Sequence, residues 1–442
     1  MKFLYKKLVF WQIICFVVIV MCCSITPDAE AQTKQKIKVG IIFSMKIKSG
    51  QDAWTSAQIA SEEINSAGGV NVRGVKYEIE LVKKDDNAEA SLIDAVNAFR
   101  SLIEVDKVDF IIGGMRSEAA MAWLDIMAQH KKIWINSGAG SPEIMARVGK
   151  DYDKYKYIFR TQVCNRRLTP LLLVNSVGLC MNELKDRGIT TRPRVAIIIE
   201  KTLAGDAFTK AAESLLPGYG VEVVGTWRPS NLATDLTPEL AAIKKVGAHI
   251  IFNFFPGGTG VPLSRAWGQL KVPALLAGMN VESQSIKHWE RTGGMCNYEV
   301  TCQSVGPMEI TKKTIPFYNN FRKKSEGDTP GYAAPTTYDA VYVLKEGIEK
   351  AGTFEADAMV EALEKTDYKG AMGRIVFFPK GHESPHDTRL EPGYITWVGN
   401  QWQDGKLVGV SPTGRVVFGD KRWEGVRYKG VVDFKLPPWF GK

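Results

Sequence analysis

Short apolar runs alternate with longer amphipathic stretches from residue 37 onward. Apolar runs of strand length occupy residues 37–43, 77–83, 109–112 and 132–135. The stretches between them, at residues 52–67, 89–104 and 118–130, have the apolar spacing of helices. Alternation of this kind, with strands that are apolar throughout, is typical of a parallel sheet covered by helices on both faces.

The same unit then occurs a second time. Further helices are predicted at residues 170–187, 207–216, 236–246 and 262–270, and further strands at 194–200, 221–227, 249–255 and 274–277. Two copies of one α/β unit predict two doubly wound, parallel-sheet lobes. The remaining chain predicts helices at 314–325, 338–351 and 355–366, a strand at 373–378, and a hairpin of strands 394–398 and 406–410 that turns near Asp404-Gly405.

The N-terminus has a different pattern. Three lysines precede an apolar run at residues 8–20, and Pro27 and a small-x-small triplet at 29–31 follow it. This order is typical of a secretory signal peptide, so we expect residues 1–31 to be removed by cleavage after Ala31. The alternative is a retained anchor helix, for which the run is short.

Composition narrows the class of protein. The chain has 442 residues, 45% hydrophobic and 24% charged, with a formal net charge of +9, which fits a globular protein of two lobes. No basic run is interleaved with aromatic residues, so nucleic acid is not an expected partner. Beyond residue 31 the cysteines are Cys164, Cys180, Cys296 and Cys302. Bonds joining Cys296 to Cys302, or Cys164 to Cys180, stay open, and no metal site is expected among the four.

Several segments resemble the Leu/Ile/Val-binding proteins, the type I periplasmic solute-binding family of ABC transporters. The matching segments are Ala60-Ser61-Glu62-Glu63-Ile64-Asn65-Ser66-Ala67-Gly68-Gly69-Val70, Asp85-Asp86-Asn87, Ile112-Gly113-Gly114-Met115-Arg116-Ser117, Ser141-Pro142-Glu143 and Phe159-Arg160-Thr161. Their order and spacing match over roughly residues 37–378, which is more specific than any single motif.

The resemblance implies two lobes joined by three crossover strands, with a cleft that closes on a ligand. On this basis we assign residues 36–160 and 304–374 to the first lobe, 161–303 and 375–420 to the second, and 421–442 to a C-terminal tail. It also implies a monomeric periplasmic protein that delivers a small-molecule solute to an ABC permease in the inner membrane. No catalytic residue and no cofactor are expected.

Ligands of such sheets bind beyond the carboxyl ends of the strands, where helices present free N–H groups. Ser117 opens a predicted helix after strand 109–112, so it can cap that helix, contact a ligand, or do both. The resemblance adds the backbone of Gly138, Ala139 and Gly140, in the next strand-end loop. Gly140 stands where the amino acid binders usually carry Thr.

In the second lobe the chain departs from the family pattern. Ala204 occupies the position of an aromatic residue that the family places over its ligand. Asn280 falls where the family has an acid for the ligand's ammonium group, with Glu282 two residues later. Loss of that acid removes a charge-assisted hydrogen bond worth roughly 1.5–3 kcal/mol, which argues against branched-chain amino acids.

Two arginines and three aromatic residues complete the predicted site. Arg116 and Arg166 form either a guanidinium clamp for a carboxylate or two solvated surface arginines. Trp54, Phe254 and Phe255 are available for stacking, although core packing is the commoner use of such residues. We therefore expect an amino acid-like solute or a carboxylate-bearing organic compound, the latter with or without an aromatic ring.

Other signals carry less weight. His382, His386 and Asp387 have the types but not the helical placement of metal ligands. The chain has no G-x-S-x-G motif and no arrangement of histidines that indicates a triad, so a hydrolase is a distant possibility. A periplasmic ligand-sensing module of a signalling receptor would share the whole two-lobe pattern and stays as the alternative function.

Overall fold

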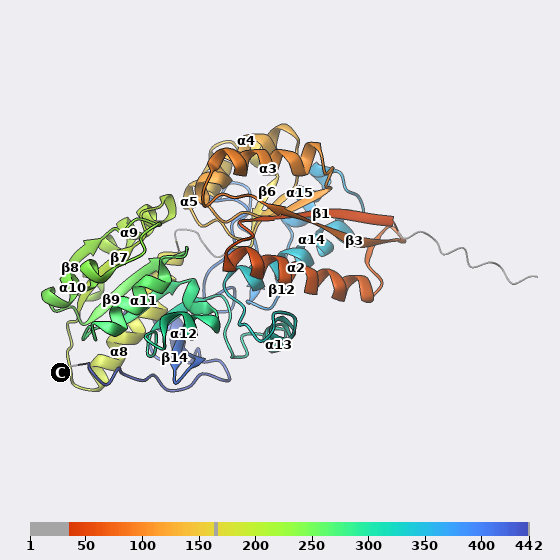
Figure 1. Ribbon diagram of the computed structural model, residues 1–442. Helices are drawn as coiled ribbons and strands as arrows, with labels where there is room; N and C mark the ends of the chain where they lie inside the picture. The colour runs from red at the N-terminus through yellow and green to blue at the C-terminus, as the bar shows by residue number, and fades with distance from the viewer. Residues whose placement is uncertain (1–34, 163–166, 441–442) are drawn as a thin grey trace, which may run out of the picture. The chain divides into compact units, whose positions relative to one another are not determined.

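The structure, a computed structural model, describes residues 35–162 and 167–440. The predicted signal peptide, Cys164 and Arg166 therefore lie outside the described residues. The described chain is built on two main sheets, and we call each sheet with its helices a lobe (Figure 1). Among the described residues, no helix has the length and apolarity needed to cross a membrane.

The first lobe is a six-stranded sheet with the order β2-β3-β1-β4-β5-β6. Its strands are β1 (Gln35–Phe43), β2 (Val70–Val72), β3 (Val75–Asp85), β4 (Phe110–Gly113), β5 (Trp134–Asn136) and β6 (Ile158–Arg160). Its helices are α2 (Lys48–Ser66), α3 (Leu92–Glu104), α4 (Ser117–Gln129), α5 (Pro142–Lys150), α6 (Tyr152–Tyr155), α13 (Thr314–Lys324), α14 (Ala333–Ala351) and α15 (Ala356–Leu363). Strands β1, β4, β5 and β6 pair in parallel, as their largely apolar sequences predict.

The second lobe is a seven-stranded sheet with the order β15-β14-β11-β10-β9-β7-β8. Its strands are β7 (Arg194–Ile199), β8 (Glu222–Trp227), β9 (Ile250–Phe255), β10 (Leu275–Asn280), β11 (Val300–Gln303), β14 (Val398–Gln403) and β15 (Lys406–Ser411). Its helices are α7 (Leu168–Leu173), η1 (Val174–Gly178), α8 (Leu179–Asp186), α9 (Leu203–Leu215), η2 (Leu216–Tyr219), α10 (Thr237–Val246), α11 (Gly260–Gln269), η3 (Glu282–Gln284) and α12 (Lys287–Thr292). The pairings from β8 to β11 are parallel, which confirms the predicted α/β fold class.

The C-terminal hairpin differs in one strand from its prediction. The turn at Asp404-Gly405 is confirmed, because Gln403 pairs with Lys406 and both turn residues have positive φ. The strand before the turn is β14 rather than residues 394–398. Tyr394 instead packs against the guanidinium groups of Arg374 and Arg389. The strand predicted at 373–378 shrinks to β13 (Arg374–Ile375), which pairs with β12 (Tyr368–Lys369).

The chain passes between the sheets after β6, after β11 and after β13. The third passage runs alongside β6 and is fixed there by a buried ion pair. Arg160 Nε donates to Asp387 Oδ1 at 2.9 Å and Nη2 donates to Oδ2 at 2.6 Å, and both side chains are fully buried. Residues near Asp387 thus contact the first sheet.

The same contact explains the histidine cluster. His386 Nδ1 lies 3.0 Å from the carbonyl oxygen of Ile158, its Nε2 lies 3.0 Å from Glu364, and its ring stacks on Phe159. His382 stacks on Phe378. These side chains hold the third passage against the first lobe.

Three cysteines can be placed. Cys180, Cys296 and Cys302 are free and fully buried, so the bond from Cys296 to Cys302 that the sequence left open is absent. Cys302 belongs to the main core, whereas Cys296 packs in a separate small cluster with Trp402 and Leu407. Burial raises the pKa of each of these thiols above its ordinary value.

Asp387→Asn leaves the Arg160 guanidinium buried without a compensating charge. We expect a loss of about 3–5 kcal/mol in the free energy of unfolding, measured as a shift of the urea midpoint. Asp367→Asn is the matched control, because Asp367 makes the same two-bond pair with Arg374 but at an exposed position. Equal shifts for the two variants would contradict a stabilising role for the buried pair.

Candidate ligand-binding pocket

A pocket lies between the carboxyl ends of the strands of the two sheets. The first lobe lines it with Met115, Arg116, Ser117, Glu118, Gly138, Gly140 and Gln162. The second lobe contributes Thr202, Ala204, Phe254, Pro256 and Met279, and Tyr332 completes the lining. Its empty space is about 410 Å³, a volume that includes the opening to solvent.

The loops after β4 and β5 form the first-lobe wall of the pocket, and their backbones lie in close contact. Gly113 and Gly114 follow β4 with positive φ, and a Cβ on Gly113 would lie 2.2 Å from the carbonyl oxygen of Ile42. A Cβ on Gly138 would lie 2.3 Å from the carbonyl oxygen of Gly114. Glycine at these positions lets the loops after β4 and β5 touch. Helix α4 then begins at Ser117, with its first turn at the pocket.

Ser117 holds the two loops together. Its Oγ accepts a hydrogen bond from the backbone N–H of Ser141 at 3.0 Å, and Ser141 in turn caps α5. No side chain caps α4, since Arg116 occupies the N-cap position without a capping hydrogen bond. The first-turn N–H groups of α4 therefore face the pocket with the positive end of the helix dipole.

Arg116 is already paired with an acid. Its Nε donates to Glu89 Oε1 at 2.7 Å, its Nη2 contacts Glu89 Oε2, and the arginine is 7% exposed. Burial acts to lower the pKa of Arg116, but the hydrogen bonds and charge of Glu89 outweigh it and raise that pKa above its ordinary value. The guanidinium thus stays charged at the pocket wall, with one face occupied by Glu89.

Glu200 stands opposite Arg116 on the second lobe. It follows β7 directly, is fully buried, and accepts a hydrogen bond from Thr259 Oγ1 at its Oε1. Its Oε2 is buried without a hydrogen-bond partner among the described residues. Burial raises the pKa of Glu200 to about 7, while Thr259 and Arg116 act in the opposite direction. A carboxylate with one unsatisfied oxygen therefore lies just behind the pocket wall.

Two contacts join the lobes beside the pocket. Glu118 Oε1 accepts a hydrogen bond from the backbone N–H of Leu203 at 3.0 Å, which brings the N-terminus of α9 to that of α4. On the other side, Gln284 Oε1 accepts from the backbone N–H of Tyr332 at 2.8 Å. The pocket lies between these two bridges, because Glu118 and Tyr332 both line it.

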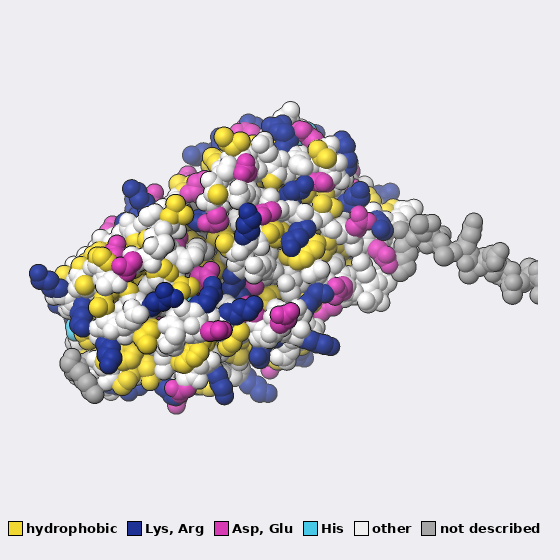
Figure 2. Space-filling model, viewed as in Figure 1, with side chains coloured by type: hydrophobic (Ala, Val, Ile, Leu, Met, Phe, Trp, Pro, Cys, Tyr) yellow, Lys and Arg dark blue, Asp and Glu magenta, His cyan; other side chains and the backbone are white. Residues whose placement is uncertain are grey.

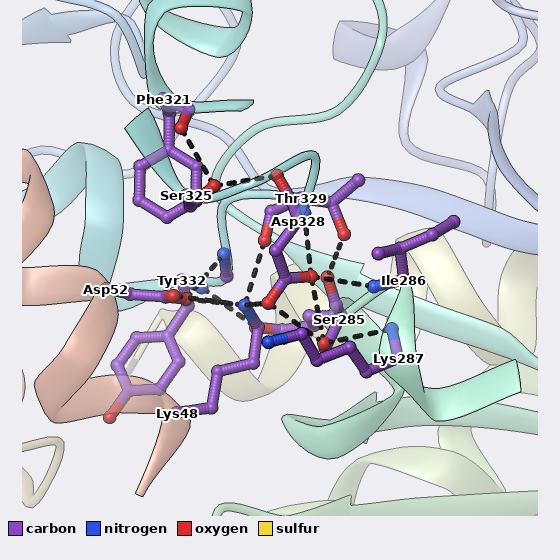
Figure 3. A network of polar contacts seen from close by, with 12 residues as sticks. Lys48, Asp52, Ser285, Ile286, Lys287, Phe321, Ser325, Asp328, Thr329 and Tyr332 are labelled. Atoms are coloured by element: carbon purple, nitrogen blue, oxygen red, sulfur yellow. Dashed lines mark hydrogen bonds and ion pairs between the residues drawn. The ribbon is translucent and has the colours of Figure 1, made fainter. Parts of the chain in front are cut away.

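The Gln284 side is reinforced by a network that we call the Lys48 clasp, formed by Lys48, Asp52, Asp328 and Ser285 (Figure 3). Lys48 Nζ lies 3.0 Å from Asp52 and 3.2 Å from Asp328. Asp328 accepts from Ser285 Oγ at 2.9 Å, so a first-lobe helix is connected to the second lobe. Burial raises the pKa of Asp52 to about 6. Burial also acts to raise the pKa of Asp328, but Lys48 and hydrogen bonds outweigh it and hold that pKa below its usual value.

The structure brings six of the predicted site residues together. They are Arg116, Ser117, Gly138, Gly140, Ala204 and Phe254. Phe254 also stacks on Phe208 of α9 with ring centroids 4.0 Å apart, so it packs the lobe as well as lining the pocket.

Five other predicted residues do not line this pocket. Trp54 packs under Lys83, with the ammonium 5.3 Å from its ring centre. Ala139 is fully buried behind Gly138, and Phe255 faces the opposite side of its sheet. Asn280 turns into the lobe, where its Nδ2 lies 2.8 Å from Glu299 and 3.0 Å from Ser264. Glu282 pairs with Arg291.

Sequence reasoning missed the acids of the site. Glu89, Glu118 and Glu200 were not singled out, nor were Thr202 and Tyr332. Glu200 did carry a signal, since it is an isolated acid that ends the apolar run of β7, where a strand meets the edge that binds ligands.

The comparisons with known proteins agree with this geometry. The family model described as periplasmic binding protein matches residues 36–390, and the chain belongs to that family. A leucine-, isoleucine-, valine-, threonine- and alanine-binding protein of Pseudomonas aeruginosa is 25% identical over 339 residues, covering 74% of this chain and 80% of the relative.

Solved structures share the fold at lower identity. A solute-binding protein of an ABC transporter from Rhodopseudomonas palustris, in complex with 3,4-dihydroxybenzoic acid, has a TM-score of 0.67 at 21% identity and covers 84% of this chain and 95% of its own. A branched-chain amino acid transporter substrate-binding protein from Streptococcus pneumoniae, in complex with isoleucine, has a TM-score of 0.67 at 19% identity. The match covers 84% of this chain and 98% of that protein. The fold is thus that of the type I periplasmic binding proteins.

The substitution Glu200→Gln tests the raised pKa of the buried Glu200 carboxyl through protein stability, in the absence of any ligand. Because the folded pKa lies above the ordinary 4.5, the contribution of Glu200 to stability is present in acid and is lost as the pH rises toward about 7. Glutamine does not ionise, so the variant does not lose this stability as the pH rises. Its melting temperature should therefore exceed that of the wild type by about 2 °C at pH 8 and by less at pH 5. Thermal melts at both pH values check this, with the exposed Glu361→Gln as the control; a parallel response of Glu200→Gln and wild type would contradict it.

Proposed function

We propose that this protein is the extracytoplasmic solute-binding component of an ABC importer. It closes its two lobes on a small carboxylate-bearing solute and delivers the solute to a permease in the inner membrane. The observation that carries the proposal is the pocket between the carboxyl ends of the two sheets, to which both lobes contribute. Affinity at such a site depends on contacts from both lobes at once, which couples binding to closure.

The first-lobe wall supports a carboxylate. The first turn of α4 and the Arg116 guanidinium both place positive potential at the pocket, and Ser117 adds a hydroxyl. The ligands named for the two structural neighbours, 3,4-dihydroxybenzoic acid and isoleucine, differ in shape but share a carboxyl group. Their common chemistry fits this wall.

The rest of the lining supports an apolar body on the solute. Met115, Ala204, Phe254, Pro256 and Met279 present carbon and sulfur atoms to the pocket. An aliphatic or aromatic group of modest size buries its surface against these residues. Ala204 in place of a larger aromatic residue leaves additional room on the second-lobe side.

The proposal also specifies where the protein acts, what it binds, and that it does not catalyse a reaction. Membership in the periplasmic binding protein family supports cleavage of the signal peptide after Ala31 and a periplasmic location. The protein acts as a monomer without cofactor and does not change its solute chemically. It has no nucleic-acid partner, in keeping with basic and acidic side chains that are interspersed on the face seen in Figure 2.

Titration calorimetry with amino acids, aliphatic carboxylates, benzoates and the corresponding amides tests the proposal. Carboxylates should bind and their amides should not. Ser117→Ala should then weaken binding of the carboxylate about 10–150-fold, the effect of one hydrogen bond to a charged group. Glu355→Ala, which removes the N-cap of α15 at a residue that does not line the pocket, should leave affinity unchanged. Tight binding of amides, or an unaltered affinity in Ser117→Ala, would contradict the proposal.

A further inference from the structure

A second cavity lies beside the ligand-binding pocket, between residues 140–143 of the first lobe and one face of α9, and we call it the α9 groove. Its empty space is about 1410 Å³, a volume that includes the opening to solvent, whereas that of the pocket is about 410 Å³. Residues of both lobes line the groove, as they line the pocket. A solute that is longer than the pocket can therefore extend within the same interface.

The pocket and the α9 groove meet at Gly140, which lines both of them. At the start of α9, Ala204 lines the pocket and its neighbour Leu203 lines the groove. In addition, Phe254 of the pocket stacks on Phe208 of the groove, with ring centroids 4.0 Å apart. Gly140 has no side chain and Ala204 has only a methyl group, so neither residue places a bulky group between the two cavities.

The α9 side of the groove is apolar. It is lined at intervals of four residues by Leu203, Ala207, Ala211 and Leu215, which therefore share one face of the helix. Leu203 is 36% exposed, and the other three are half-buried. The charged residues of the lining are all exposed to solvent. The groove thus offers a strip of hydrocarbon surface, which suits an alkyl chain better than a second charged group.

Hydrogen bonds connect the walls of the groove to the carboxylate-binding end of the pocket. The backbone N–H of Ser141, in the groove, donates to Ser117 Oγ at 3.0 Å. The backbone N–H of Leu203 donates to Glu118 Oε1, also at 3.0 Å. The residues on the two sides of the boundary thus keep their relative positions while the lobes are joined.

We propose, on the basis of the proposed function, that the pocket and the α9 groove form one elongated binding site for a carboxylate that carries an alkyl chain. The carboxylate lies at Ser117 and the first turn of α4, and the alkyl chain crosses Gly140 and lies along α9. Continuity with the pocket favours the solute itself as the occupant over a segment of another protein, because Gly140 connects the groove to the carboxylate-binding end.

The length of the α9 groove sets the length of the solute. Ala211 lies two turns beyond Ala204, which is about 10 Å along the helix. An alkyl chain on this face leaves water one methylene at a time, and each buried methylene strengthens binding about fourfold. Affinity should therefore rise with alkyl length and level off once the alkyl chain passes Ser214, which is exposed to solvent.

Titration calorimetry of the wild type with butanoate, hexanoate, octanoate and decanoate tests the proposal. Each step in this series adds two methylenes, so affinity should increase about tenfold per step as the alkyl chain enters the groove. The stoichiometry should stay at one solute per protein, whereas adsorption to exposed apolar surface would exceed that value. Equal affinities for the four solutes, or a decrease beyond hexanoate, would overturn the elongated site.

Ala211→Trp fills the groove at a distance from the pocket. This variant should bind octanoate and decanoate about tenfold more weakly than the wild type and should bind butanoate within about twofold of it. Ala241→Trp is the matched control, because Ala241 is an exposed alanine of α10 that lines neither cavity. It should bind all four solutes as the wild type does, and melting curves establish that both variants are folded. Decanoate bound equally well by Ala211→Trp and the wild type would show that the alkyl chain does not occupy the groove.

Competition tests whether one solute occupies both cavities. Saturating butanoate should displace octanoate, since the two carboxylates need the same place at Ser117. Independent binding of the two solutes would mean that octanoate occupies the groove alone, which contradicts a single elongated site.

The outcomes also separate this proposal from the proposed function. If butanoate or benzoate binds but the longer carboxylates bind no more tightly, the elongated site is wrong and the carboxylate-binding function stands. If no carboxylate of any length binds to the wild type, the proposed function fails and the elongated site fails with it.

Discussion

The parallel pairing of strands is the constraint on which the rest of this structure depends. A parallel sheet directs the carboxyl ends of its strands to a common edge, and here the residues that follow β4, β5, β7 and β9 meet around one pocket. The glycines after β4 and β5 let the first-lobe loops approach until backbone atoms touch. A larger residue at Gly113, Gly114 or Gly138 would move the start of α4 and with it Arg116 and Ser117.

Much of the fold could be predicted from the sequence, because runs of buried apolar residues are long and regular. The two α/β units were found in this way, and the Asp-Gly pair indicated the hairpin turn at Asp404-Gly405. Of the six predicted residues that line the pocket, Gly138, Gly140 and Ala204 came from the family resemblance. Arg116 and Ser117 after β4, Gly138 and Gly140 after β5, and Ala204 after β7 were located because they belong to the strand-end loops themselves.

The errors arose where side-chain direction decides the outcome. Successive residues of a strand point to opposite faces, so Phe254 reaches the pocket whereas Phe255 packs on the other side. Asn280 lies next to the pocket residue Met279 but turns into the lobe toward Glu299 and Ser264. Glu89 reaches the pocket wall through its ion pair with Arg116, a contact between residues 27 positions apart. No local pattern in the sequence specifies that pairing.

Buried charged groups have different roles within a lobe and between the two lobes. Within the first lobe, Arg160 and Asp387 neutralise each other completely and hold a passage of the chain in place. Between the lobes, the polar contacts include the Glu118 hydrogen bond, the hydrogen bonds of Gln284 with Tyr332 and Thr329, and the Lys48 clasp. A ligand that adds contacts on both sides can therefore shift the balance between separated and joined lobes with a modest free energy.

The tail beyond β15 has a consequence for the behaviour of the protein in concentrated solution. An edge strand with unpaired backbone groups invites another chain to add to it, which leads to aggregation. Here the N–H of Val432 donates to the carbonyl oxygen of Gly409 in β15 at 2.8 Å, and Gln401 and Gln403 of β14 donate to the backbone of Lys435 and Asp433. Part of the tail thus occupies the open edge of the second sheet at Gly409, where a strand of a neighbouring molecule would otherwise pair.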